Sequence, residues 1–162
     1  MLLALKNLVF TVLVPGTVAG FVPYRLVSRS GAARLDAPHL LVAAPLALVG
    51  LAIYFWCLWD FAVAGRGTPA PIDPPKHLVV RGLYRYVRNP IYVGVLLVVA
   101  GWAVAFRSSA VLEYGVAVAL AFHLFVMLVE EPLLRRRFGA TYEAYRRAVP
   151  RWLPRPPQGR GG

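Results

Sequence analysis

Four long apolar stretches constrain this 162-residue sequence more than any other feature. They are Leu2–Tyr24, Ala37–Trp59, Ile91–Phe106 and Ala110–Val129. A helix needs about 20 apolar residues to cross the ~30 Å hydrocarbon core of a bilayer, and only the third stretch is clearly shorter. Charged residues make up 15% of the chain, against about 25% in soluble domains. The sequence therefore predicts an all-α integral membrane protein with about four transmembrane helices.

The first apolar stretch could also be a secretory signal peptide, which would be removed from the mature protein. However, no basic region precedes its apolar core, and Ala19-Gly20-Phe21 matches a cleavage site poorly. A transmembrane helix is therefore the favoured interpretation of this stretch.

The basic residues are distributed unevenly among the segments that connect these stretches. With four crossings, the N-terminus, the segment after Trp59 and the C-terminal segment share one side of the membrane. All but four of the 18 Lys and Arg residues lie on that side, the exceptions being Arg25, Arg29, Arg34 and Arg107. Because cytoplasmic segments are enriched in Lys and Arg, we expect both termini in the cytoplasm, for example at a bacterial inner membrane. The lipid bilayer is thus the expected partner, and the net charge of +11 requires no nucleic acid.

The composition divides the sequence into five consecutive parts. They are an N-terminal transmembrane helix pair (1–63), a cytoplasmic loop (64–90), a transmembrane helical hairpin (91–131), interfacial C-terminal helices (132–154) and a disordered tail (155–162). The interfacial part is amphipathic, with apolar residues at Leu134, Phe138, Tyr142, Tyr145 and Val149. Spacings of three and four place these residues on one helix face, which is typical of a cytoplasmic segment lying among the headgroups. We expect Gly139 to break this segment into two pieces.

The cytoplasmic loop ends in a cluster of tyrosines and arginines, GLYRYVRNPIYVG. Asn89 is a strong helix N-cap and Pro90 suits the first helical position, so we expect the third helix to begin here. The free N–H groups and positive dipole end of such a helix attract anions. Arg85 and Arg88 add cationic donors. The alternative interpretation is a belt of aromatic and basic residues at the membrane interface.

Two adjacent glutamates follow the fourth apolar stretch, in VEEPLLRRRFG. The connection RSSA between the third and fourth stretches allows only an antiparallel hairpin, so the glutamates come near the start of the third helix. We expect the fourth helix to end at this pair. Adjacent helical residues point about 100° apart, so we expect Glu130 to face the hairpin and Glu131 to face headgroups or Arg135–Arg137. The two helix ends then suit a ligand that carries a carboxylate, an ammonium and a sulfonium.

These two motifs resemble those of the isoprenylcysteine carboxyl methyltransferase family, together with its bacterial relatives and the phospholipid methyltransferases. The resemblance covers Lys76–Pro154 and implies a helical membrane protein that binds S-adenosylmethionine without a Rossmann domain. The cofactor contacts that it implies are Lys76, His77, Leu78, Val79, Tyr84, Asn89, Pro90, Ile91, Tyr92 and Glu130. The isoprenylcysteine enzymes usually have His at the position of Asn89, and a substrate-binding arginine at the position of Val126.

The resemblance implies an S-adenosylmethionine-dependent methyltransferase with a cytoplasmic active site. Its acceptor would be lipophilic, either isoprenylcysteine carboxylate-like or phospholipid-like, and would enter from the bilayer. We assign no catalytic residue and no metal, because methyl transfer from a sulfonium needs positioning more than acid–base chemistry. His123 is a candidate for the acceptor cavity or else a packing histidine. The alternatives are an NADPH-dependent membrane enzyme similar to sterol reductases, and a non-catalytic membrane protein whose basic face binds anionic lipid or a partner.

Overall fold

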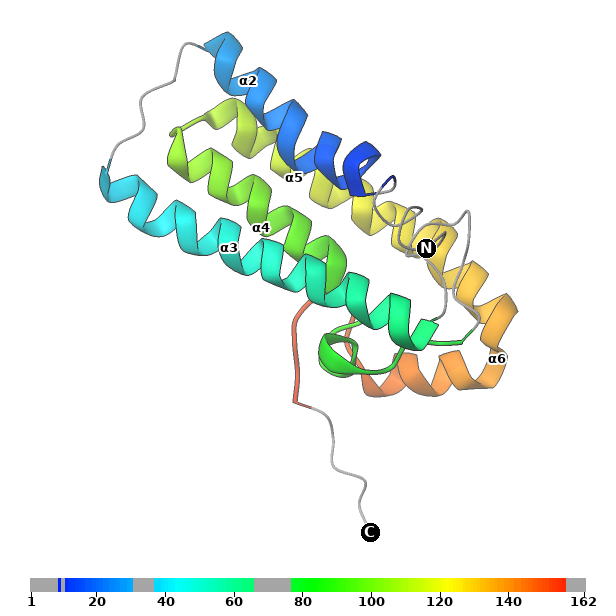
Figure 1. Ribbon diagram of the computed structural model, residues 1–162. Coiled ribbons are helices and arrows are strands. Elements are labelled where there is room, and N and C mark those ends of the chain that lie inside the picture. The colour runs from blue at the N-terminus through cyan, green and yellow to red at the C-terminus, as the bar shows by residue number, and fades with distance from the viewer. Residues whose placement is uncertain (1–8, 10, 31–36, 66–76, 157–162) are drawn as a thin grey trace.

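The computed structural model describes residues 9, 11–30, 37–65 and 77–156, and these contain helices and no strand (Figure 1). In chain order the elements are η1 (Thr17–Phe21), α2 (Val22–Ser30), α3 (Ala37–Asp60), η2 (Phe61–Gly65), η3 (Gly82–Arg85), α4 (Pro90–Ala105), α5 (Ser109–Phe125), η4 (Val126–Glu130) and α6 (Glu131–Ala148). The elements η1, η2 and η4 are π-helical turns, and η3 is a 3₁₀ turn.

All four apolar stretches contain helices, as predicted. The first helix continues to Ser30, beyond the predicted Tyr24, and its last part buries Pro23 and Val27. Among the described residues, two helices are long and apolar enough to cross a membrane, Ala37–Val63 and Ser109–Ala148. Pro90–Ala105 is a shorter apolar helix. The prediction of an all-helical fold is confirmed for the described residues, while the number of membrane crossings stays a prediction.

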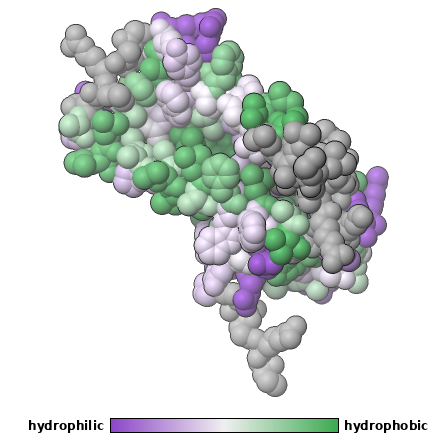
Figure 2. Space-filling view, viewed as in Figure 1, coloured by the Kyte–Doolittle hydropathy of each residue, from purple (hydrophilic) through white to green (hydrophobic). Residues whose placement is uncertain are grey.

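Successive helices run in alternating directions (Figure 1). The end of α2, the start of α3 and the α4–α5 connection lie at one end of the bundle, and α6 lies at the other. Figure 2 shows a hydrophobic surface over the helices and hydrophilic patches toward both ends. This arrangement places the basic residues of α6 at the end opposite Arg25, Arg29 and Arg107, which is the separation on which the topology prediction depends.

Glycines allow α3 and α4 to pack with their backbones close together. A Cβ atom at Gly50 would lie 2.6 Å from the Gly94 carbonyl oxygen, and one at Gly94 would lie 2.8 Å from the Gly50 carbonyl oxygen. A Cβ atom at Gly101 would lie 3.1 Å from the carbonyl oxygen of Ala43. Small residues at helix crossings are typical of membrane proteins, where close van der Waals packing replaces the hydrophobic effect between helices.

We expect Gly94→Ala to destabilise the protein by about 1–3 kcal/mol, because the added methyl group would meet backbone atoms that cannot move independently. The measurement is the thermal unfolding midpoint of the purified variant in detergent. Gly20→Ala is the matched control, since a Cβ atom at Gly20 meets nothing within 4 Å. Equal midpoints for the two variants would contradict the close-packing explanation.

The fourth helix does not end at the two glutamates, which corrects the prediction. The backbone stays helical from α5 through η4 into α6, and Glu130 and Glu131 have αR torsion angles. Pro132 has no N–H group for the usual helical hydrogen bond, and the wider π-helical turn η4 ends two residues before it. The two carboxylates therefore lie within a continuous helix and not at its C-terminal end.

The helix changes direction at Gly139, whose backbone is non-helical with φ 51° and ψ −127°. This break was predicted and is confirmed. Beyond it, the predicted apolar face packs against protein: Tyr142, Tyr145 and Val149 are buried, with Leu78, Leu134 and Phe138 against them. Because this face covers residues 77–89, hereafter the motif loop, its position among lipid headgroups stays a prediction.

The end of α3 anchors the motif loop from the other side. Asp60 is 1% exposed, and its Oδ1 atom lies 2.9 Å from Nε of Arg81. Gly82 follows with a positive φ of 52°, and a Cβ atom there would collide with Asp60. Glycine at this position therefore allows the loop to lie directly on the end of α3.

Residues 149–156, hereafter the C-terminal strap, run along the motif loop. The Arg88 N–H donates to the Pro150 carbonyl oxygen at 2.9 Å, and the Arg155 N–H donates to that of Tyr86 at 3.1 Å. Arg155 is therefore attached to the fold, although the sequence predicted a disordered tail from this residue. The rest of that prediction, at residues 157–162, lies outside the described part of the chain.

Candidate functional site

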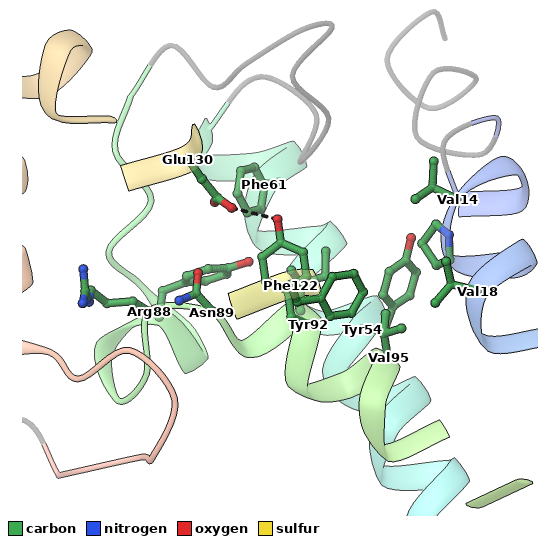
Figure 3. Close-up of a pocket in the computed structure, with 13 residues that line it drawn as sticks. Val14, Val18, Tyr54, Phe61, Arg88, Asn89, Tyr92, Val95, Phe122 and Glu130 are labelled. Atoms are coloured by element: carbon green, nitrogen blue, oxygen red, sulfur yellow. Dashed lines mark hydrogen bonds between the residues drawn. The ribbon is translucent and has the colours of Figure 1, made fainter. Parts of the chain in front are cut away.

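One cavity lies where the N-terminal helical residues, α3, the motif loop, α4 and η4 meet (Figure 3). Its lining consists of Val14, Pro15, Val18, Tyr54, Phe61, Tyr84, Arg88, Asn89, Ile91, Tyr92, Val95, Phe122 and Glu130. The cavity volume is about 70 Å³, below the roughly 300–1,000 Å³ of typical ligand pockets. Any larger ligand must therefore displace side chains of this lining.

A hydrogen bond between two helices closes the centre of the cavity. The Tyr92 hydroxyl, on the first turn of α4, donates to Oε2 of Glu130 at 2.7 Å (Figure 3). The Tyr92 ring also packs on Phe122, with centroids 4.7 Å apart. The antiparallel α4–α5 hairpin thus brings Glu130 to the start of α4, as its short connection predicted.

Asn89 occupies the N-cap position of α4 and Pro90 its first turn, as predicted, but the Asn89 side chain makes no capping hydrogen bond. Its Nδ2 atom instead donates to the Arg151 carbonyl oxygen at 3.2 Å. The Asn89 side chain, which the sequence predicted would cap α4, therefore binds the C-terminal strap. The first N–H groups of α4 lack this cap, so they remain donors at the cavity edge.

Two buried polar atoms on residues that line the cavity lack hydrogen-bond partners among the described residues, the Tyr84 hydroxyl oxygen and Nε of Arg88. The Tyr84 hydroxyl lies beside the Cys57 thiol, which is only a weak hydrogen-bonding group. Burial raises the pKa of the Tyr84 hydroxyl well above its ordinary value, so this group is a neutral donor. Unsatisfied buried polar groups are costly, and they favour a polar ligand in this place.

Glu131 is buried, 5% exposed, which corrects the prediction that it faces headgroups and Arg135–Arg137. Its Oε1 atom lies 3.1 Å from Nη1 of Arg88 and 2.7 Å from Nε of Arg151. Arg135 pairs with Glu143 instead, at 2.9 Å. The hydrogen bond to Glu131 raises the pKa of Arg151 above its ordinary value. Glu131 thus joins the motif loop to the C-terminal strap.

The cavity brings together half of the predicted cofactor residues, Tyr84, Asn89, Ile91, Tyr92 and Glu130. The other four that the structure describes do not line it: His77 is exposed, Leu78 packs on α6, Val79 and Pro90 are buried. Lys76 lies outside the described residues. Val79 packs instead in a buried cluster with Cys57 and Tyr84, beside the cavity.

His123 does not line the cavity, although the sequence left this open. Its Nδ1 atom accepts a hydrogen bond from Nε1 of Trp152 at 3.0 Å, which makes it a packing histidine. Sequence reasoning missed Tyr54 and Phe122 as lining residues. Both lie in apolar stretches that hold other aromatic residues, such as Phe55 and Trp56 beside Tyr54, and no feature of the sequence singled them out.

Comparisons with known proteins bear on this site. Residues 38–141 match the family model described as phospholipid methyltransferase. Methanethiol S-methyltransferase 2 of Bradyrhizobium diazoefficiens is 41% identical over 73 residues, which are 45% of this chain and 27% of that protein. The chain therefore matches only about a quarter of the length of this curated relative. No solved structure matches the chain.

Proposed function

The chain belongs to the phospholipid methyltransferase family, and we propose that it transfers a methyl group from S-adenosylmethionine to an apolar acceptor in the membrane. One observation carries the proposal: the Tyr92–Glu130 pair lies in the same cavity as Arg88 and Asn89. These residues come from the two motifs that resemble methyltransferase sequences. The cavity thus offers a carboxylate together with cationic and neutral donors, as the cofactor's ammonium, sulfonium and carboxylate require.

The side chains fit the charges of S-adenosylmethionine. Glu130 would hold its positively charged groups, since Glu130 contributes the one carboxylate among the described lining residues. Arg88, Asn89 and the uncapped N–H groups of α4 would hold its carboxylate. The Tyr84 hydroxyl and Nε of Arg88 would gain the partners that they lack. Because the cavity is narrow, we expect the Tyr92–Glu130 hydrogen bond to open when the cofactor enters.

S-Adenosylmethionine supplies, when bound, a methyl group bonded to a positively charged sulfur. The acceptor atom forms a bond to the methyl carbon with its own lone pair, while the pair of the broken bond stays on the sulfur. The protein's part is to align the acceptor and to exclude water, which lowers the barrier without acid–base catalysis. The apolar lining of Val18, Val95 and Phe122 suits that part.

The acceptor is proposed to enter from the bilayer. Val14 lines the cavity and is also 47% exposed on the apolar surface, so this side of the cavity reaches the lipid-facing part of the chain. Val126, at the position of the family's substrate arginine, is 1% exposed and does not line the cavity. An isoprenylcysteine carboxylate would therefore lack that partner. The methanethiol-methylating relative supports testing thiols beside lipids.

Calorimetric titration of the purified protein in detergent tests the proposal. We expect binding of S-adenosylmethionine and no binding of NADPH. The same preparation is then assayed by mass spectrometry for methyl transfer to phosphatidylethanolamine, S-farnesylcysteine and hexanethiol. Binding of NADPH alone would favour the reductase alternative, and binding of neither compound would favour the non-catalytic one.

We also expect the C-terminus to be cytoplasmic and the α2–α3 connection to lie on the opposite side, because most of the basic residues are near the C-terminal end of the bundle. Reporter fusions at the C-terminus and after Ser30 measure this in cells. A fusion within residues 66–76 is the control and should report the same side as the C-terminus. Signals on one side from both the C-terminus and Ser30 would exclude four crossings.

A further inference from the structure

The cavity has two chemically different ends. Arg88, Asn89 and Glu130 are at the polar end (Figure 3). The other end is lined by Val14, Val18 and Val95, and Tyr54 lies among them, on the opposite side of the view from Arg88 and Asn89. Phe122 and Tyr92 lie between the two ends.

Tyr54 carries the one polar side chain among the described residues that line the apolar end. It is 4% exposed, and its hydroxyl lies 2.8 Å from Oγ1 of Thr11, with either oxygen able to donate. When Thr11 donates, the Tyr54 proton is free for another acceptor. In that arrangement a buried hydroxyl donor lies next to the place where an apolar molecule would lie.

We propose that the apolar end binds the methyl acceptor, that this acceptor is a thiol with a short apolar group, and that Tyr54 contacts its sulfur. This inference rests on the proposed function. A carboxylate or an ammonium would have to enter this apolar end already charged and lose its hydration, which is strongly unfavourable, whereas a thiol would become charged only next to the cofactor's positively charged sulfur. A thiol enters as a neutral molecule, and a cavity of about 70 Å³ favours a short substituent.

The reaction step balances with these groups. The thiol loses its proton to solvent before water is excluded from the site, and the thiolate lone pair forms the new bond to the methyl carbon. The bond between that carbon and the cofactor sulfur breaks, and its electron pair leaves that sulfur neutral. The Tyr54 hydroxyl donates a hydrogen bond to the thiolate, and hydrogen bonds to charged groups are stronger than neutral ones. Tyr54 thus favours the reactive form of the acceptor.

The test compares wild type with Tyr54→Phe, which keeps the ring and removes the hydroxyl. We expect an unchanged affinity for S-adenosylmethionine and a fall in kcat/KM for hexanethiol of about tenfold to hundredfold, as for a lost hydrogen bond to a charged group. The rise of kcat with pH should move to higher pH, because kcat reports the ionisation of the bound thiol, whose thiolate form loses its donor. Hexanethiol binding in the presence of S-adenosylhomocysteine gives a second readout by calorimetry, and we expect it to weaken about threefold.

A control variant separates this role from a structural one. The Tyr114 hydroxyl also tethers the N-terminal helical residues, since it donates to the Val18 carbonyl oxygen at 2.9 Å. Tyr114→Phe should therefore not shift the pH dependence. An equal shift in Tyr114→Phe, or no shift in Tyr54→Phe, would overturn the inference.

The remaining outcomes also decide between the two proposals. If the wild type binds S-adenosylmethionine but methylates phosphatidylethanolamine and not hexanethiol, the proposed function stands and the thiol inference fails. If the wild type binds no S-adenosylmethionine, the proposed function fails, and the inference fails with it. Methylation of hexanethiol that depends on the Tyr54 hydroxyl supports both.

Discussion

Glu130→Gln is expected to bind S-adenosylmethionine about tenfold to hundredfold more weakly than the wild type, with little change in the thermal stability of the free protein. Glu130 supplies the cavity's carboxylate, and losing a hydrogen bond to a charged group costs about 1.5–3 kcal/mol. Glutamine keeps an oxygen that can accept from the Tyr92 hydroxyl, so the 2.7 Å contact between α4 and η4 is preserved. Only the charge is lost.

Calorimetric titration in detergent measures this effect, and Glu143→Gln is the matched control. Glu143 is also a carboxylate on the α5–α6 helix, but it pairs with Arg135 and Arg146 and its side chain is 32% exposed. Its loss should leave cofactor affinity unchanged, since exposed pairs are worth only about 0–1 kcal/mol. If Glu130→Gln and Glu143→Gln weaken binding equally, general electrostatics explain the result, and Glu130 does not contact the cofactor.

The helices and the centre of the site could be predicted because their causes are local in the sequence. Apolar stretches of sufficient length form helices in a membrane, since every backbone polar group must be bonded within the segment. The short connection after Phe106 allowed only an antiparallel hairpin, which placed Glu130 near Tyr92. The paired motifs then identified five residues that line the cavity.

The parts that sequence reasoning missed depend on contacts between distant segments. The Asn89 side chain donates to the carbonyl oxygen of Arg151, in the C-terminal strap. The helix-capping preference of asparagine depends only on neighbouring residues, so it could not predict a partner so distant in the sequence. Helix periodicity correctly separated the directions of Glu130 and Glu131. It could not show that the chain would fold back at Gly139 and cover Glu131 with Arg151.

Glu131→Gln is expected to destabilise the protein by about 3 kcal/mol, in contrast to Glu130→Gln. Removing one partner of a buried ion pair costs roughly 3–5 kcal/mol, because the remaining charge stays buried without compensation. The Arg88 side chain is 9% exposed and would be left in that state. Arg151 is 27% exposed and can reach water, which places the estimate at the lower end of the range.

The thermal unfolding midpoint in detergent measures this loss, and about 3 kcal/mol corresponds to a decrease of roughly 6–12 °C for a chain of this size. Glu143→Gln again serves as the control and should lower the midpoint by at most a few degrees, because both of its ion pairs are partly exposed. The unfolding midpoint of Arg151→Gln should lie between those of Glu131→Gln and Glu143→Gln, because Glu131 would keep its contact with Arg88. A midpoint for Glu131→Gln equal to that of Glu143→Gln would mean that this carboxylate faces solvent in the native protein, and that the C-terminal strap is not held by Arg151.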